Sequence, residues 1–208
     1  MICVFRRLWD DVRAVALIEF AFAAPLFLTL VLGGLELTNF ALAHLRVSQV
    51  AMTVADNAGR VTNGIDEAHV YEVFAGARVV AESLDFEDNG RVVLSSLENN
   101  GQTGSNAGQM IRWQRCWGSL AVAPAYGVQG TGRTSGGLRL GMGPPGNRII
   151  AVPGNAVMFV EASYRYQPLL NFWFNSERTI RYETAFNVRS RQNQVISNTQ
   201  ALAVLDCD

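Results

Sequence analysis

The sequence AVALIEFAFAAPLFLTLVLGGL, residues 14–35, decides the architecture of this 208-residue chain. A helix needs about 20 predominantly apolar residues to cross the hydrocarbon core of a bilayer. The stretch meets that length if Glu19 is included. The preceding leader, residues 1–14, is rich in arginine, so the positive-inside rule predicts that it stays in the cytoplasm. We therefore expect one membrane span over about residues 15–37, with the rest of the chain outside the cytoplasm.

Glu19 is the one ionisable residue inside this apolar run. An acid at the centre of a bilayer costs about 2.5–3.5 kcal/mol on insertion scales, so intramembrane acids are candidates for function. A second interpretation is that Glu19 lies near the cytoplasmic interface, solvated or protonated, and has no role. The setting of Glu19, after a basic leader and directly before Phe20 and an unbroken apolar run, favours a function.

The segment RAVALIEF, residues 13–20, resembles the processing site of type IV prepilins, in particular of TadE-like proteins from the tight-adherence (Flp) pilus system. The resemblance implies that a prepilin peptidase cuts between Ala14 and Val15, so that Glu19 becomes the fifth residue of the mature chain and Phe20 the sixth. The family usually has Gly before the cut, whereas this sequence has Ala14. Cleavage would expose an ammonium group on Val15, and the Glu19 of a neighbouring subunit is a suitable partner for that charge.

The segment YRYQPLLNFW, residues 164–173, also resembles a tyrosine–proline–leucine feature of the same family. The resemblance as a whole implies a membrane-anchored minor pilin or pseudopilin that takes part in pilus assembly and surface attachment. The implied partners are the prepilin peptidase, other pilins or pseudopilins, the inner-membrane assembly platform and the membrane itself. The implied location is the inner membrane, with a cytoplasmic N-terminus and a periplasmic or extracellular C-terminal domain.

Two other interpretations stay open. Ala41-Leu42-Ala43 follows the apolar run and matches a signal-peptidase site, which would make the chain a secreted binding domain cleaved after Ala43. Alternatively, the chain is a single-pass envelope scaffold that enters no filament. The first residue of the native protein, Val15, His44 or Met1, distinguishes the three interpretations.

The fold class predicted is α+β, with a long N-terminal helix, transmembrane and then amphipathic, packed on an antiparallel sheet as in pilins. The parts are the leader 1–14, the helix 15–60 and an extracytoplasmic α+β domain 61–208. Apolar residues recur at helical spacing through residues 41–60, namely Leu42, Leu45, Val47, Val50, Val54 and Ala58. A second helix over residues 67–84 is expected to begin at a cap, Asp66. Strands are expected at residues 91–97, 110–117, 148–152, 156–167 and 178–189.

The connecting segments carry weaker signals. We expect a turn at residues 88–90 and a mobile surface excursion in the glycine-rich stretch 127–146. Gly141–Gly146 matches G-x-G-x-x-G as a string, but its adjacent prolines prevent the helix that a dinucleotide site needs. The aromatic connector 169–175 is expected either to form an apolar contact surface or to fold into the core, with the core slightly favoured.

Cys116 and Cys207 are expected to form one disulfide in an oxidising compartment, with two free thiols as the alternative. Cys3 lies in the leader. Two isolated cysteines and two distant histidines, His44 and His69, do not make a metal-ligand set, and His69 is expected at a helix surface.

The sequence contains no catalytic motif, so we expect a protein that is not an enzyme and uses no cofactor. Its net charge of −1 argues against a nucleic-acid partner. Glu161 and Glu183 are expected to form ordinary surface pairs across the sheet with Arg165 or Arg181.

Overall fold

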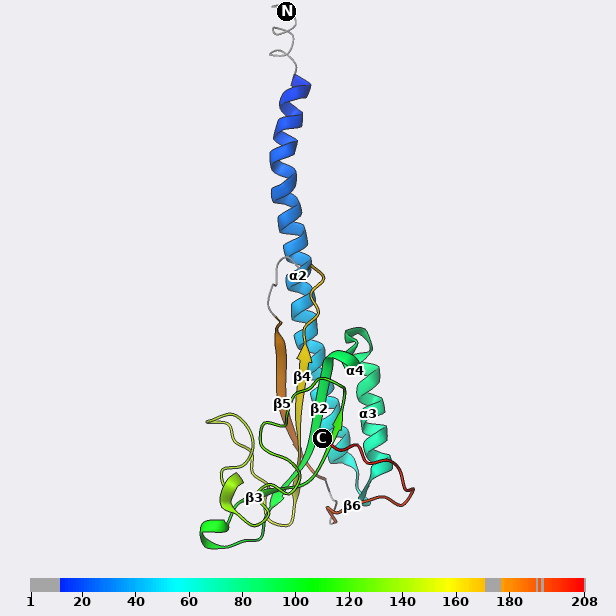
Figure 1. Cartoon of the computed structure of the whole chain (residues 1–208), viewed down its shortest axis with the longest axis vertical. Helices are drawn as coiled ribbons and strands as arrows, with labels where there is room; N and C mark the ends of the chain where they lie inside the picture. The colour runs from blue at the N-terminus through cyan, green and yellow to red at the C-terminus, as the bar shows by residue number, and fades with distance from the viewer. Residues whose placement is uncertain (1–11, 171–176, 190, 192, 208) are drawn as a thin grey trace, which may run out of the picture. The chain divides into compact units, whose positions relative to one another are not determined.

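A computed structural model describes residues 12–170, 177–189, 191 and 193–207, with side chains from residue 15 onward (Figure 1). Most of the leader, with Cys3, and residues 171–176 of the aromatic connector lie outside the described residues. The chain divides into two compact units, one of residues 1–42 with 167–176 and one of residues 43–166 with 177–208. Helix α2, Val12–Arg60, contributes residues to both.

The first unit contains the apolar part of α2, which passes through Pro25 without a break in the helix. The Thr29 hydroxyl donates to the Pro25 carbonyl at 2.7 Å, and the Thr38 hydroxyl donates to the Gly34 carbonyl at 2.8 Å. Such hydroxyl bonds to a carbonyl four residues earlier satisfy side-chain donors inside an apolar helix. The helix continues although Pro25 removes the amide that would donate to the Ala21 carbonyl.

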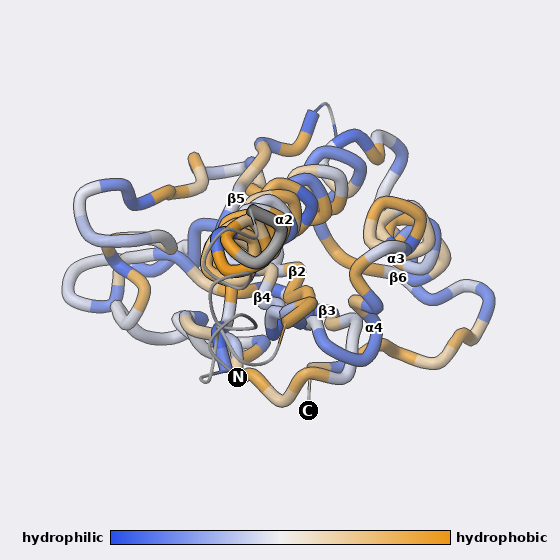
Figure 2. The backbone as a smooth tube through the Cα atoms, turned by 90° about the horizontal axis from the view of Figure 1, so that it is seen from above, coloured by the Kyte–Doolittle hydropathy of each residue, from blue (hydrophilic) through white to orange (hydrophobic). Residues whose placement is uncertain are grey.

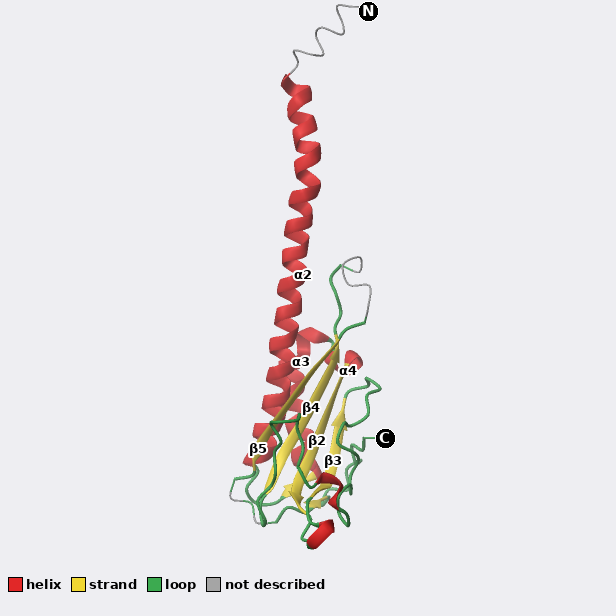
Figure 3. Ribbon diagram, turned by 90° about the vertical axis from the view of Figure 1, so that its left-hand side faces the viewer, coloured by secondary structure: helices red, strands yellow, loops and turns green. Residues whose placement is uncertain are grey.

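The second unit is built on a sheet with strand order β3-β2-β4-β5, in which every neighbouring pair is antiparallel (Figure 3). The strands are β2 Gly90–Asn99, β3 Gln109–Trp117, β4 Ala156–Arg165 and β5 Thr179–Asn187. This confirms the predicted α+β class and four of the five predicted strands. A register shift between Ser95 and Leu97 accommodates an extra residue in β3, which explains why apolar residues alternate imperfectly along it.

Helices cover one face of the sheet. Residues 43–60 of α2 bury Val47, Val50 and Val54 completely, which confirms the predicted apolar stripe from Val47 to Ala58. Leu42 and Leu45 are exposed instead, because a helical turn of 100° per residue places them on the side away from Val47.

Helix α3, Glu67–Ala81, covers the same face and begins at the predicted cap, Asp66. Asp66 accepts from the Ala68 amide, and His69 accepts from the Asp66 amide, so the two form a capping box. His69 is half-buried rather than at a free surface, because its ring closes that box. A short 3-10 turn, Glu82–Leu84, extends the predicted helix to its expected end.

An irregular layer covers the opposite face. Leu138, Met142 and Ala151 pack against Val157 and Phe159 of β4 in a buried cluster. The prediction that residues 127–146 are a surface excursion is therefore wrong in part, since apolar side chains spaced between the glycines anchor this stretch to the sheet.

The predicted strand 148–152 does not form beyond a single bridge between Met142 and Ile149. Its facing segment turns at Gly141, with φ of +81°, and an added Cβ there would lie 2.0 Å from the Ile149 carbonyl oxygen. A left-handed residue in such close contact cannot continue a regular ladder.

Among the α-helices and strands of the described residues, one helical turn and one pair of short strands were not predicted. One helical turn, α4 Phe86–Asn89, replaces the expected turn and follows Asp85, which has φ of +46°. The second element is a parallel pair of two-residue strands, β1 Ile65–Asp66 and β6 Ile196–Ser197. Two-residue strands have no periodicity that a sequence pattern can reveal.

Candidate functional site: the exposed apolar helix and its carboxylates

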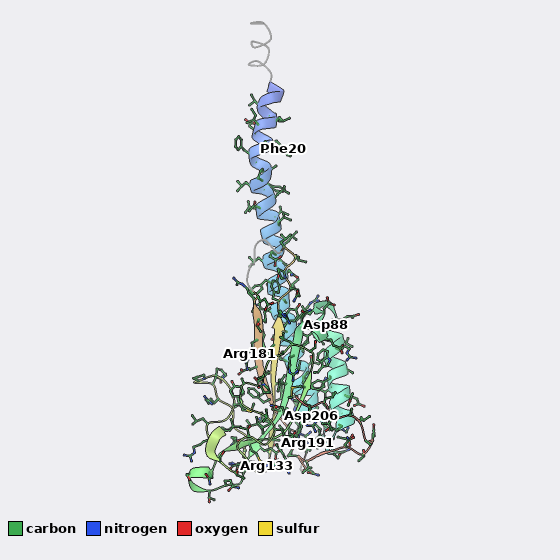
Figure 4. All side chains as sticks on the ribbon, viewed as in Figure 1. Phe20, Asp88, Arg133, Arg181, Arg191 and Asp206 are labelled. Atoms are coloured by element: carbon green, nitrogen blue, oxygen red, sulfur yellow. A yellow bond between two sulfur atoms is a disulfide. The ribbon has the colours of Figure 1, made fainter. Side chains whose placement is uncertain are left out.

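The apolar part of α2 exposes its large side chains along residues 15–35. Phe20 is 71 % exposed, and Phe22, Phe27 and Leu30 are comparably open. The helix is long and apolar enough to cross a membrane, and no residue of its most apolar 18-residue stretch is buried. Figure 2 shows the apolar colouring of this helix and Figure 4 shows Phe20 projecting outward from it. A helix that is apolar all round and unburied suits a hydrocarbon environment, which suggests a membrane anchor.

The expected processing and assembly residues lie at the start of this helix. Val15, Glu19 and Phe20 are helical and exposed. Ala14 also lies in α2, and its side chain is outside the described part. The arrangement leaves the Glu19 carboxylate accessible to another molecule, while the cleavage and the pairing role predicted for these residues remain predictions.

Glu36 is the second carboxylate among the described residues of the first unit, and the sequence pattern predicted no role for it. Only 1 % of its surface is exposed. Its Oε2 atom accepts from the Leu169 amide at 3.0 Å and from the Leu170 amide at 3.1 Å. A carboxylate that receives two backbone N–H bonds is well placed in an otherwise apolar setting. The sequence signal was available: an acid directly follows the apolar run, and Pro168-Leu169-Leu170 supplies a segment whose amides need acceptors.

The disulfide predicted between Cys116 and Cys207 is present, with a Cα–Cα distance of 4.9 Å. It fixes the C-terminal segment to β3, where the Cys116 amide also donates to the Leu205 carbonyl at 2.8 Å. The adjacent Arg115 forms a buried ion pair with Glu67, the first residue of α3. Separating α3 from β3 would leave each of these buried charges without its partner, which is costly. The ion pair therefore holds α3 against β3 in one position.

The Glu161 carboxylate lies on the loop-covered face and is buried rather than at the surface. It accepts from Arg181 at 2.5 Å and from the Ala125 amide at 3.0 Å, while its second oxygen, Oε1, has no partner among the described residues. Burial raises the pKa of Glu161, and the Ala125 amide and Arg181 oppose that shift. Glu183 lies directly opposite Glu161 on β5, and Arg181 bridges the two like charges.

Tyr126 completes the cluster by donating its hydroxyl to Glu183 at 2.7 Å. Burial and this bond raise the pKa of Tyr126 to about 12. The expected pairing of Glu161 and Glu183 with Arg181 is thus present, while Arg165 lies near Glu177 at 3.6 Å instead. The expectation of ordinary surface pairs is wrong because the loop layer covers the face that carries them.

His44 and His69 lie apart and serve different contacts. His44 Nδ1 is 3.2 Å from the Tyr182 hydroxyl, and His69 belongs to the capping box of α3. Across the described ranges, no three His, Cys, Asp or Glu side chains gather closely enough to hold a metal ion. The string Gly141–Gly146 lies in a loop that no helix follows directly.

Residues 14–56 match the family model described as TadE-like protein. The match includes Ala14, Val15, Glu19 and Phe20, and it confirms the resemblance that the N-terminal segment suggested. No curated protein and no solved structure matches the chain. Together, the matched segment and the long apolar helix fit a protein associated with the tight-adherence pilus.

Proposed function

We propose that this TadE-like protein is a membrane-anchored minor pilin or pseudopilin that acts in the assembly of a tight-adherence pilus and in surface attachment. The observation that carries the proposal is the exposed apolar helix of residues 15–35, whose one ionisable side chain is Glu19. Such a surface is stable in lipid or among other apolar helices. The α+β domain that follows is then held at the membrane, outside the cytoplasm, with the leader on the cytoplasmic side.

Prepilin peptidase is the proposed processing enzyme, and its cut between Ala14 and Val15 creates a new N-terminal ammonium four residues before Glu19. Within an assembly of apolar helices, that ammonium needs an acidic partner, and Glu19 of an adjacent pilin or pseudopilin is the acid at the right depth. The chain is proposed to contribute binding surfaces rather than catalysis, with the inner-membrane assembly platform as a further partner and no nucleic acid involved.

The interpretation as a secreted domain cleaved after Ala43 has less support. Ala43 lies within α2, and its side chain is buried in the second unit. A cut there would place a charged new terminus in the packed domain, where an unpaired charge is costly.

Intact-mass measurement and N-terminal sequencing of the protein from cell envelopes test the proposal. We expect a chain that begins at Val15. A chain that begins at His44 would identify a secreted domain, and one that begins at Met1 would identify an unprocessed scaffold.

The second arm of the test is Glu19→Gln, which removes the charge at nearly constant volume. We expect normal cleavage and membrane insertion but a loss of pili and of surface attachment. Glu72→Gln is the matched control, because Glu72 is an exposed glutamate on α3 in the second unit. Pili at wild-type level in the Glu19→Gln strain would contradict the role of Glu19.

A further inference from the structure

The two outer edges of the sheet differ in how their backbone groups are satisfied. At the β3 edge, the Ile111 amide donates to the Thr131 carbonyl at 2.9 Å and the Gly130 amide donates to the Ile111 carbonyl at 2.8 Å. The Gln114 amide of the same strand donates to the Gln129 side chain, and the Cys116 amide donates to Leu205. The loop layer and the C-terminal segment therefore cover this edge.

The β5 edge is open. The Tyr166 amide donates to the Arg178 carbonyl, and the Val188 amide donates to the Ala156 carbonyl, so even-numbered residues of β5 make the ladder to β4. The amides and carbonyls of Arg181, Glu183 and Ala185 point the other way. In the part of the chain that the structure describes, no backbone or side-chain group bonds to them. Figures 1 and 3 show β5 at the outside of the sheet.

We propose that the β5 edge, residues 179–185, receives an extended segment of another protein as an additional antiparallel strand. Unpaired strand edges are templates for strand addition, in which backbone bonds supply affinity and alternate side chains supply specificity. The open edge here carries three free donors and three free acceptors in a row, and it is stiffened by the complete β4 ladder behind it.

The side chains at the edge define the chemistry of the partner strand. Arg181 and Glu183 lie on the same face, and Arg181 is 39 % exposed. An antiparallel strand places its own residues directly opposite these two, and opposite charges at such positions stabilise pairing. The partner segment therefore has a basic residue opposite Glu183 and an acidic residue, two positions later, opposite Arg181. Between them, an apolar or aromatic residue meets Tyr182.

A second copy of this chain carries the required side-chain pattern on its own β5, but in the same membrane its strand cannot pair with this edge. His44 contacts Tyr182, and Gly59 lies against Asn187, so residues 43–60 of α2 run in the same direction as β5. Antiparallel pairing of two β5 strands would direct the two Ala43 ends, which continue into the apolar helices, in opposite directions. Parallel pairing in register would bring Arg181 beside Arg181 and Glu183 beside Glu183, which like-charge repulsion disfavours.

A free peptide is not anchored in the membrane, so it can pair with the edge in the antiparallel direction. A peptide with the sequence of β5 therefore serves as a probe. The peptide TIRYETAFN, residues 179–187, has the basic–aromatic–acidic pattern that the edge requires. When it pairs antiparallel about Tyr182, its arginine meets Glu183 and its glutamate meets Arg181. We expect the labelled peptide to bind the full chain in detergent, measured by fluorescence anisotropy. A peptide with Arg181 and Glu183 exchanged is expected to bind about tenfold more weakly.

Hydrogen exchange locates the binding. In the free protein, we expect fast exchange at the amides of Arg181, Glu183 and Ala185 and slow exchange at Tyr182 and Thr184. Bound peptide should slow the three fast amides and leave the two slow ones unchanged. Unchanged exchange at the three edge amides with saturating peptide would overturn the proposal. It would show that the charged side chains of β5 prevent another strand from pairing with this edge.

Ala185→Pro removes one outward donor without touching the β4 ladder, and proline is tolerated at such edge positions. We expect this variant to bind the peptide at least about tenfold more weakly, while Ala185→Val, the control, retains the wild-type affinity.

Equal binding by the exchanged peptide would overturn the assigned charge pattern. A full-length dimer that protects the same amides without peptide would overturn the choice of another protein as the partner. These readouts do not depend on where the chain is cleaved, so they are independent of the proposed pilus function.

Discussion

The two parts of helix α2 differ in whether the chain itself buries their apolar side chains. Residues 15–35 expose nearly all of their large apolar side chains, whereas residues 43–60 bury Val47, Val50 and Val54 and expose polar groups between them. Both parts are helical by the same backbone bonds. The difference teaches that the sheet of the second unit supplies the apolar surroundings of residues 43–60. The described part of the chain supplies no such surroundings for residues 15–35.

The largest expected effect comes from placing the same charge in each part. Val54 is fully buried and Val31 is 42 % exposed. Val54→Asp buries an unpaired carboxylate, which we expect to cost about 5 kcal/mol or more and so to prevent stable folding of the domain. Val31→Asp should leave the unfolding temperature of the domain unchanged and weaken membrane retention, since a central acid costs about 2.5–3.5 kcal/mol. Thermal unfolding in detergent and membrane fractionation measure the two effects, and equal losses of domain stability would contradict the comparison.

The disulfide gives the next largest effect, confined to the second unit. Cys116 and Cys207 are 91 residues apart, and a loop of that length is worth about 4–5 kcal/mol in the chain-entropy account. We expect the double variant Cys116→Ser/Cys207→Ser to lower the free energy of unfolding by about 2–5 kcal/mol in denaturant titrations. Membrane association should not change. Cys3→Ser, made in a recombinant chain that keeps the leader, is the matched control, and a similar destabilisation by it would show that the assigned pairing is incomplete.

The smallest expected effect is the acid response of the cap of α3. The Ala68 and Thr199 amides, with the hydroxyls of Ser197 and Thr199, lower the pKa of Asp66 to about 2. Because this folded pKa lies below the unfolded value near 4, the ionised cap stabilises the domain above about pH 4 and loses that contribution as the pH falls toward 2.

We expect Asp66→Asn to unfold at a lower temperature than the wild type at pH 7, with the gap closing toward pH 2. Circular dichroism melts across this pH range measure the difference. The Glu72→Gln variant, which alters an exposed glutamate of the same helix, should follow the wild-type profile. A constant gap between Asp66→Asn and wild type at every pH would contradict the assigned ionised cap.

Periodicity in the sequence was sufficient for the long elements. The apolar run, the Val47–Ala58 stripe, the Asp66 cap and four strands all follow from local spacing and composition, and the structure bears them out. Local spacing failed where a partner distant in sequence decides the outcome. Leu42 and Leu45 continue the apolar composition but are exposed, and the 148–152 segment forms only a single bridge, to Met142.

The sequence by itself determined that this protein has an unburied apolar helix with a single acid, Glu19, followed by an α+β domain. It could do so because helix length, apolar composition and strand alternation are local properties of the chain. Only the tertiary structure decided which carboxylates are buried, since Glu36, Glu67 and Glu161 are surrounded by groups far away in sequence. The covered β3 edge and the open β5 edge likewise depend on where the loop layer and the C-terminal segment pack.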